Sequence, residues 1–399
     1  MFLCVVAVGI MLVGFPWHYF LIAQKFLNPL KPMLNSVRCT VAPKAIHRVK
    51  VSLTTKCNSD CGYCFIRCPT SDMTWPIAKD AVDLLLGSSQ EEKLLSCYGG
   101  EPLLQFQLLK QMVMYARGVE KENNKRLTIS CCTNSLLLRD DHLSFFKEFD
   151  VRVHISLFGR EEDNNRYRAR GFKKVIENLA KASEALGGTH TSACVCVTPQ
   201  TVRYLREDIE TIRKRTGTRV ITIEPIIEIE PWRLEDVSVF IEQIRLICKN
   251  LIDSVTMGRS FFLNSLCWHL KAGRQRPKIS SNAGYDFCPF LGTLDVSPSG
   301  DIAFSPFTLY GKKEKRGVVG NVQEAQGAWW QSCTFEKGSS VCLECYSKYY
   351  SFGGFSDKSK YLLNYMDALI DETSRFLRAA AVSDKRYGQY VKEAKLYAS

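Results

Sequence analysis

Charge is missing from one long stretch of this sequence, and several other patterns are missing from all of it. Residues 1–23 contain no Asp, Glu, Lys or Arg. The chain has no internal repeat and no low-complexity run. It also has no run of Lys and Arg with interleaved aromatic residues, which argues against a nucleic-acid-binding protein. With 46% hydrophobic and 24% charged residues, the composition is that of an ordinary globular enzyme.

The uncharged segment at residues 1–23 is long enough to cross a bilayer once. It lacks the basic start and the small-residue cleavage site of a secretory signal. Basic residues follow it from Lys25 to Arg48, so the positive-inside rule would leave the rest of the chain in the cytoplasm. Three interpretations stay open: a membrane anchor, a helix packed on the body, or a misassigned start.

The cysteines and the net charge bear on the compartment and the partner. There are 17 cysteines, an odd number, and several lie within apolar runs, as Cys131, Cys132, Cys194 and Cys196 do. We expect these to be reduced core thiols in a cytoplasmic protein. The net charge of +12 indicates either a solvated basic surface or an anionic partner, such as membrane headgroups or an acidic peptide.

Three cysteines, Cys57, Cys61 and Cys64, lie within eight residues. They follow an alternating apolar run that is typical of a strand, and the residues between them are loop formers. The run consists of Val49, Val51 and Leu53. Cysteine thiolates hold iron–sulfur clusters. Because a cubane cluster has four irons, three ligands would leave one iron open to a small molecule.

A zinc site is the alternative for these thiols. Two-residue Cys spacings are common in zinc sites, but there they usually come as pairs of pairs. Cys68 follows Cys64 after a three-residue gap, so a four-thiol site is a second alternative. A disulfide framework is not expected in a chain of this size and class.

Strand-like and helix-like segments alternate between residues 47 and 225. The sequence predicts strands at 47–54, 94–98, 127–133, 151–157, 191–198 and 219–224. Apolar residues at helical spacing predict helices at 172–186, 203–216 and 236–253. Six such units indicate an α/β fold with a parallel sheet, a partial (β/α)6 TIM-like barrel whose functional loops follow the strands.

The second predicted strand ends in Gly99, Gly100 and Glu101. Paired glycines let the backbone approach a ligand closely, and the carboxylate of Glu101 can hold an ammonium group. Alone, such a pair is most often a plain turn. Its position after the strand that follows the three-cysteine loop is what makes it informative.

Together these motifs resemble the radical S-adenosylmethionine (SAM) superfamily, over about residues 47–225. The resemblance implies a [4Fe-4S] cluster on Cys57, Cys61 and Cys64, and SAM as the second cofactor. It implies that the cluster passes an electron to SAM and that the resulting 5′-deoxyadenosyl radical removes a hydrogen atom from the substrate. It also implies that Gly99, Gly100 and Glu101 hold the amino group of SAM.

Further SAM contacts are implied for Ser156 and Arg168. Thr133-Asn134-Ser135 stands where the family usually has Thr-Asn-Gly. Phe158 stands where related peptide-modifying enzymes usually have Asp, which weakens any inference about that loop. No catalytic acid or base is assigned.

The segment 288–356 resembles the auxiliary-cluster (SPASM) domain of radical SAM peptide and protein maturases. Family cysteine positions fall on Ser305, Ser351 and Phe355, which indicates a degenerate site. Four remaining thiols could form one zinc or cluster site, or the segment could be free of clusters and serve in substrate docking. These thiols are Cys288, Cys333, Cys342 and Cys345.

The expected function is a radical SAM maturase that cross-links a ribosomally made peptide and takes electrons from a flavodoxin- or ferredoxin-type donor. An anaerobic sulfatase-maturing enzyme, which makes formylglycine, is the alternative of the same class. A non-enzymatic iron–sulfur or zinc module is the alternative of another class. The expected domains are an apolar segment and linker (1–44), a radical SAM core (45–255), a bridging region (256–287), a SPASM-like domain (288–356) and a C-terminal helix (357–399).

Overall fold

The structure is a computed structural model. It describes residues 46–66, 68–168, 171–226, 229–272, 292–303, 306–310, 318–324, 370 and 372–397. The apolar segment 1–23 therefore lies outside the described residues. So do Ser305, Ser351, Phe355 and the four thiols from Cys288 to Cys345.

The described chain is built on one sheet of ten strands in the order β10-β9-β8-β1-β2-β3-β4-β5-β6-β7. Strands β8 and β1 to β7 are parallel, whereas β9 and β10 pair antiparallel at one edge. The strands are β1 (Arg48–Thr54), β2 (Glu92–Gly99), β3 (Arg126–Thr133), β4 (Val151–Leu157), β5 (Thr191–Val197), β6 (Val220–Pro225), β7 (Phe262–Leu263), β8 (Thr293–Val296), β9 (Asp301–Ala303) and β10 (Val318–Asn321).

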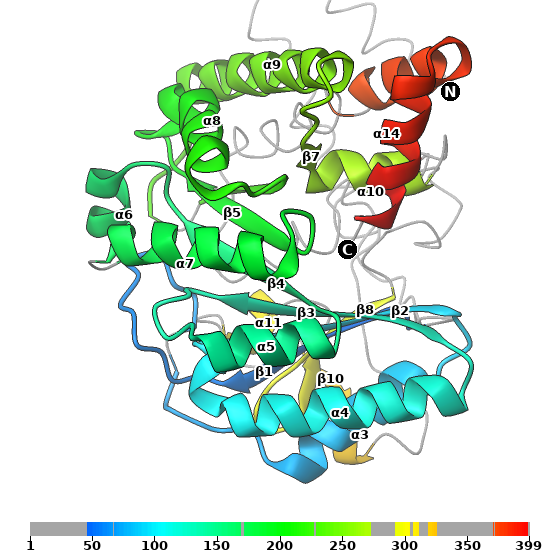
Figure 1. Cartoon of the computed structure of the whole chain (residues 1–399). Coiled ribbons are helices and arrows are strands. Elements are labelled where there is room, and N and C mark those ends of the chain that lie inside the picture. Colours follow the sequence, from blue (N-terminus) through cyan, green and yellow to red (C-terminus); the bar gives the residue numbers. More distant parts are fainter. Residues whose placement is uncertain are drawn as a thin grey trace, which may run out of the picture.

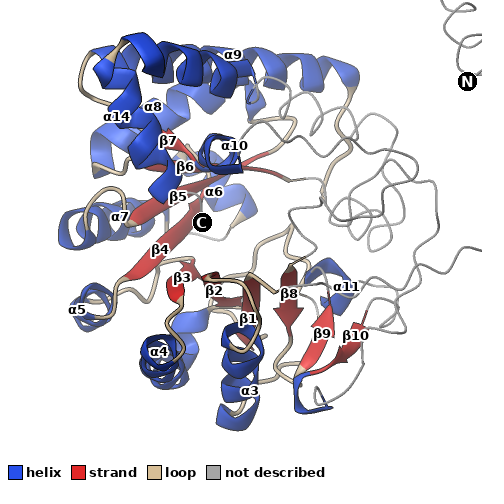
Figure 2. Ribbon diagram, turned by 90° about the vertical axis from the view of Figure 1, so that its right-hand side faces the viewer, coloured by secondary structure: helices blue, strands red, loops and turns tan. Residues whose placement is uncertain are grey.

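Helices connect the parallel strands and cover one side of the sheet. Figure 2 shows the strands as a curved row with α3, α4, α5, α7, α8 and α9 on its outer side. The α-helices are α3 (Trp75–Leu86), α4 (Phe106–Glu122), α5 (Asp140–Glu148), α6 (Glu161–Tyr167), α7 (Phe172–Leu186), α8 (Leu205–Thr216), α9 (Leu234–Thr256), α10 (Asn264–Ala272), α11 (Pro306–Tyr310) and α14 (Lys385–Leu396). The described residues also form the short 3-10 helices η3 (Pro102–Gln105), η4 (Val202–Tyr204) and η5 (Val322–Glu324).

Strand β4 shows how the sequence separates the two faces of the sheet. Its residues alternate between buried and half-buried. Val151, Val153 and Ile155 belong to the apolar core under the helices. Because side chains alternate along a strand, His154 and Ser156 lie on the concave face. The sheet therefore has an apolar outer face and a polar inner face.

The predicted partial barrel is confirmed, and all six predicted strands are present within about two residues of the predicted bounds. The carboxyl ends of β1 to β5 meet at one edge of the sheet, because these strands are parallel. This edge carries the three-cysteine loop and the motifs after the second, third and fourth strands (Figure 1).

Two parts of the observed fold differ from the sequence expectation. Residues 256–287 were expected only as a bridging region, but their described part contains β7 and α10. Strand β8, from the segment expected to be a separate domain, pairs with β1, so the sheet continues across residue 288. The division into domains stays a prediction. In the described part of the C-terminal region, helical residues 372–383 and α14 are separated by Asp384.

No helix in the described ranges is both long and apolar enough to cross a membrane.

Candidate active site

The loop after β1 holds the three predicted cluster ligands. Cys57 is exposed, and Cys61 and Cys64 are half-buried. The loop is fixed at its centre, where the Gly62 amide donates to the Tyr167 carbonyl over 3.0 Å at the end of α6. A turn within the loop follows, in which the Cys64 amide donates to the Cys61 carbonyl over 3.0 Å.

The three thiols influence one another electrostatically. Burial raises the pKa of Cys61, Arg168 opposes this, and Cys64 and Cys57 raise the pKa further. Burial also raises the pKa of Cys57. Across the described residues, no group of three or more His, Cys, Asp or Glu side chains is already gathered as for a metal ion. The three thiols lie on one loop, and thiolates are the donors that hold iron–sulfur clusters. Binding of a cluster would have to draw the three sulfur atoms together.

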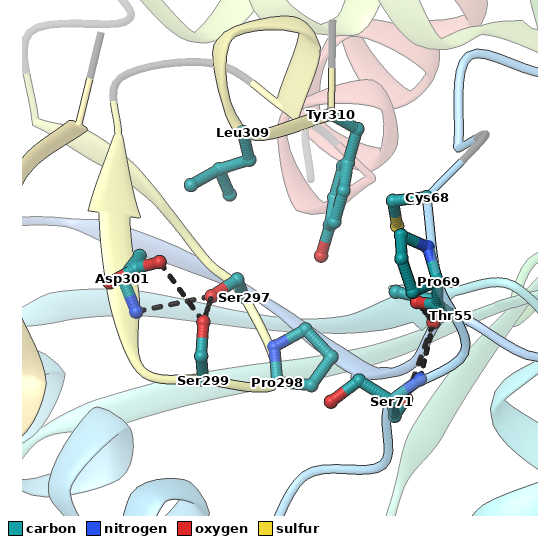
Figure 3. Close-up of a pocket in the computed structure, with 10 residues that line it drawn as sticks. All are labelled: Thr55, Cys68, Pro69, Ser71, Ser297, Pro298, Ser299, Asp301, Leu309 and Tyr310. Carbon is teal, nitrogen blue, oxygen red and sulfur yellow. Dashed lines mark hydrogen bonds between the residues drawn. The ribbon is translucent and has the colours of Figure 1, made fainter. Parts of the chain in front are cut away.

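Cys68 lies in a different place from these three thiols. It lines a pocket of about 170 Å³ between the loop after β1 and the turn that joins β8 to β9. Figure 3 shows Cys68 and Thr55 on one side of this pocket, Ser299 and Asp301 on the other, and Tyr310 between them. Burial raises the pKa of Cys68, and Thr55 is the neighbour that opposes it most. This placement gives no support to the four-thiol alternative.

The glycines at the end of β2 are required by close backbone packing. Gly99 has a φ of +132°, in the region that favours glycine. A Cβ on Gly100 would lie 2.0 Å from the Lys56 carbonyl oxygen. The Gly100 amide donates to the Thr54 carbonyl over 2.7 Å, and the Glu101 amide donates to the Lys56 carbonyl over 2.8 Å. Gly99, Gly100 and Glu101 therefore fix the end of β2 against the start of the three-cysteine loop.

Glu101 is fully buried and joins the end of β2 to the end of β3. Its Oε1 accepts from the Leu103 amide over 3.1 Å and from the Thr133 hydroxyl over 2.7 Å. Its Oε2 accepts from the Asn134 amide over 2.8 Å. Burial raises the pKa of Glu101, and these hydrogen bonds oppose the shift. A carboxylate offers about four acceptor positions, so one remains for an ammonium group.

Asn134 is a site residue whose role the sequence did not reveal. Its side-chain amide donates to Asn58 Oδ1 over 2.7 Å and approaches the Cys57 thiol at 3.8 Å. A chain of contacts thus runs from Glu101 through Asn134 to the three-cysteine loop. The Thr-Asn pair after the third strand was noticed in the sequence, but only the fold brings it to Cys57.

Arg168 lies against the other side of the loop. Its guanidinium donates to the Tyr63 hydroxyl and approaches the Cys196 sulfur at 4.0 Å. Phe158 stacks on Tyr167 with ring centroids 5.0 Å apart and meets the edge of Tyr63 at 5.9 Å. Phe158, the departure from the family pattern, thus belongs to an aromatic cluster that supports the loop.

Ser156 lies on the concave face of β4. It is half-buried and pairs in register with Cys194 of β5. Cys132 and Cys194 are also half-buried, whereas Cys131 belongs to the core under the helices and Cys196 lies in the aromatic cluster. The described cysteines are all free thiols. Cys132 and Cys194, which were expected in the core, are not part of the apolar core.

A buried charged network on the concave face was not anticipated from the sequence. Asp295 of β8 is fully buried and accepts from the Tyr98 hydroxyl over 2.8 Å. Its other oxygen lies 3.8 Å from the Lys50 ammonium. Burial raises the pKa of Asp295, and Lys50 opposes this most. The interior beside the candidate cofactor site is therefore polar and charged.

His154, also on this face, is expected to make the folded protein less stable in acid. Burial, and then Arg48 and Arg152, lower its pKa from 6.5 to about 4. Between these values the unfolded chain binds the proton and the folded chain does not, so stability falls as the pH drops. We expect this group to contribute about 2 kcal/mol of lost stability between pH 7 and pH 5.

Urea unfolding of the cluster-free protein at both pH values measures this contribution. His154→Gln keeps a polar partner for Ser192 but cannot take up the proton, so its stability should fall less than that of the wild type over the same interval. If the wild type and His154→Gln lose the same unfolding free energy between pH 7 and pH 5, His154 is not the group responsible.

Comparison of the sequence with known proteins gives one family match and several relatives. Residues 51–212 match the sequence model described as the radical SAM superfamily. An uncharacterized protein of Methanocaldococcus jannaschii is 33% identical over 112 residues, which are 28% of this chain and 38% of that protein. The radical SAM cyclopropyl synthase TigE of Paramaledivibacter caminithermalis is 21% identical over 321 residues, 74% of this chain and 63% of that enzyme. The chain thus spans less than two thirds of these relatives.

The fold is similar to that of a solved structure, anSMEcpe with bound AdoMet. The TM-score is 0.62 at 14% identity, over 88% of this chain and 98% of that one. Another structure of anSMEcpe, with AdoMet and the Cp18Cys peptide, gives a TM-score of 0.59 at 16% identity, over 82% and 99% of the two chains.

The sequence match supports the radical SAM superfamily for residues 51–212, and the solved structures show a shared fold. The cofactors of that family are a [4Fe-4S] cluster and SAM, as the sequence predicted.

Proposed function

We propose that the chain is a radical SAM enzyme that modifies a peptide or protein, with a ribosomally made peptide as substrate and a cross-link as product. The radical SAM part of this proposal rests on the series of contacts that runs from Glu101 through Asn134 to Cys57 in the three-cysteine loop. A peptide substrate is supported by the fold shared with anSMEcpe, of which two structures hold a peptide.

The residues of the chain have separate roles in this proposal. Cys57, Cys61 and Cys64 would hold the cluster, and Gly99, Gly100, Glu101, Ser156 and Arg168 would position SAM. When bound, the two cofactors supply the radical that removes a hydrogen atom from the substrate. Asn134 keeps Cys57 and Asn58 in place, while Arg168 and Tyr63 hold the opposite side of the loop.

Anaerobic incubation of reconstituted protein with dithionite and SAM tests the proposal. An enzyme makes 5′-deoxyadenosine, whereas an iron–sulfur or zinc module that only senses or scaffolds makes none. Chromatography of the products gives the answer, and a protein with a full cluster but no 5′-deoxyadenosine would overturn the proposal.

A formylglycine-generating enzyme of the sulfatase-maturing type is the second candidate, favoured by the fold shared with anSMEcpe. Mass spectrometry separates the two reactions on peptide substrates. Formylglycine formation converts one Cys or Ser, whereas a cross-link joins two residues. The flavodoxin- or ferredoxin-type electron donor, the cytoplasmic location and the membrane contact through residues 1–23 remain parts of the proposal.

The iron content tests the degenerate C-terminal segment. We expect about four irons per chain, because one cubane holds four and Ser305, Ser351 and Phe355 replace family cysteines. About eight would indicate a second cubane on Cys288, Cys333, Cys342 and Cys345. Iron analysis of anaerobically reconstituted protein measures this, and about twelve irons would contradict a degenerate segment.

A further inference from the structure

A groove on the outer surface follows helices α8 and α9, away from the candidate cofactor site. It has a volume of about 760 Å³ and is lined by both helices and by the segments that lead into β6 and β7. Helix α8 begins after the carboxyl end of β5 and ends before β6 (Figure 1). The lining runs from Arg206, near the start of α8, to Arg219, just before β6, so the groove extends from near the functional edge of the sheet toward its opposite edge.

Cations outnumber acids in this groove. Its lining includes Arg206, Arg213, Lys214, Arg219 and Arg259, but only two acids, Glu210 and Asp253. Glu210 pairs with Arg206 at 3.0 Å, and Glu393 of α14 lies 3.8 Å from Arg219. Lys214 and Arg259 are exposed, and neither has an acidic partner in the part of the chain that the structure describes. The groove therefore presents uncompensated positive charge.

Arg213 shows that this charge is held in place. Its guanidinium lies 3.9 Å from the centroid of the Phe261 ring and donates to the Arg259 carbonyl over 3.2 Å. Its Nε is buried without a hydrogen-bond partner. Burial lowers the pKa of Arg213, Glu210 opposes this, and the like charge of Arg219 lowers it further. A bound anion would offset both the cost of burying the charge of Arg213 and its repulsion from Arg219.

The groove also has apolar lining. Ile209, Ile247 and Phe261 line it but are each at most 2% exposed, whereas Met257, which also lines it, has 72% of its surface exposed. Exposed Met257 beside exposed basic side chains suits a chain that carries both acidic and apolar side chains. The volume lies within the range of about 300–1,000 Å³ for ligand sites, which fits a short segment and not a folded domain.

We propose that the α8–α9 groove binds an acidic segment of the peptide substrate, separate from the part that is modified. This inference rests on the proposed peptide substrate and adds where that substrate docks. The segment would lie along the exposed basic side chains and lead toward the edge where the three-cysteine loop lies. Charge complementarity would give both the affinity and a strong dependence on salt.

A charge-reversal pair tests the groove. Lys214→Glu with Arg259→Glu changes two exposed side chains that take no part in the candidate active site. The probe is a fluorescein-labelled 16-residue peptide of alternating Glu and Leu pairs, compared with the same peptide carrying Lys for Glu. Fluorescence anisotropy on full-length reconstituted protein should show that the Glu peptide binds the wild type and that the pair weakens this binding at least tenfold.

A matched control has the same change of net charge elsewhere. Lys121→Glu with Lys147→Glu alters exposed residues of α4 and α5 and should bind the Glu peptide as the wild type does. Equal weakening in both pairs, or binding of the Lys peptide as tight as that of the Glu peptide, would overturn the proposal. So would binding to phosphatidylserine vesicles that depends on Lys214 and Arg259 without any binding of the Glu peptide.

The failure of this inference can be told apart from the failure of the proposed function. SAM cleavage with dithionite, measured without any peptide, should be the same in the wild type and in both charge-reversal pairs. Absent cleavage in the wild type would overturn the proposed function, whereas intact cleavage with unaltered peptide binding in the groove pair would overturn the docking inference alone.

Discussion

Replacing Cys61 with alanine is expected to abolish SAM cleavage. Cys61 lies between Cys57 and Cys64 on the loop, and both affect its thiol electrostatically. Two thiolates cannot hold a cubane in place of three, so the cluster and its charge-transfer absorbance should be lost. The loss should exceed the 10–100-fold decrease that is typical of removing a residue that only supports a metal ligand, which is about 1.4–2.7 kcal/mol.

Cys68→Ala is the matched control for this experiment, because it removes a thiol from the same segment. Cys68 lines the pocket with Tyr310, and none of the other three thiols does. The control should keep its absorbance near the wild-type value and still produce 5′-deoxyadenosine. Retained cleavage in Cys61→Ala would remove the radical SAM assignment, and a loss of cluster in Cys68→Ala would restore the four-thiol alternative.

The helices and strands could be predicted where local patterns are strong. Helix α7 was predicted at its observed bounds, Phe172–Leu186, because its apolar residues have helical spacing and Gly187, with a φ of +90°, ends it. The six main strands are likewise marked by apolar runs between turn residues. In each case the signal lies within about fifteen residues of sequence.

The parts that the sequence did not reveal depend on contacts between distant residues. Strand β7 has only two residues, Phe262 and Leu263, too few for any periodicity. Strand β8 is buried throughout and has no alternation, so nothing in its own residues shows that it pairs with β1. The Lys50–Asp295 pair was equally invisible in the sequence, because Lys50 comes from β1 and Asp295 from β8.

The candidate site was predictable as a set of residues but not as a set of contacts. The sequence placed Cys57 and Glu101 at strand ends and Arg168 downstream of the fourth strand, and the parallel sheet brings those strand ends to one edge. It did not show that the Glu101 carboxylate binds the Asn134 amide, or that Arg168 donates to Tyr63. Hydrogen bonds of this kind depend on side-chain direction, which spacing alone does not fix.

Glu101→Gln is expected to separate the structural role of this residue from its role in SAM binding. The amide keeps an oxygen for Leu103 and Thr133, but it directs an N–H group at the Asn134 amide, which is also a donor. A buried donor left without a partner costs about 1–3 kcal/mol, so the melting temperature should fall. The amide also cannot pair with the ammonium group of SAM as a carboxylate does.

The affinity for SAM decides between the two roles. A hydrogen bond to a charged group contributes about 1.5–3 kcal/mol, so its loss should weaken SAM binding by about tenfold to a hundredfold. Asp295→Asn is the control, because it also alters a fully buried carboxylate of the same sheet but lies at the Lys50 and Tyr98 network. The control should lower the melting temperature and leave the calorimetric dissociation constant of SAM unchanged. If Glu101→Gln also leaves that constant unchanged, Glu101 serves only to join β2 to β3, and the ammonium group of SAM must be held by other residues.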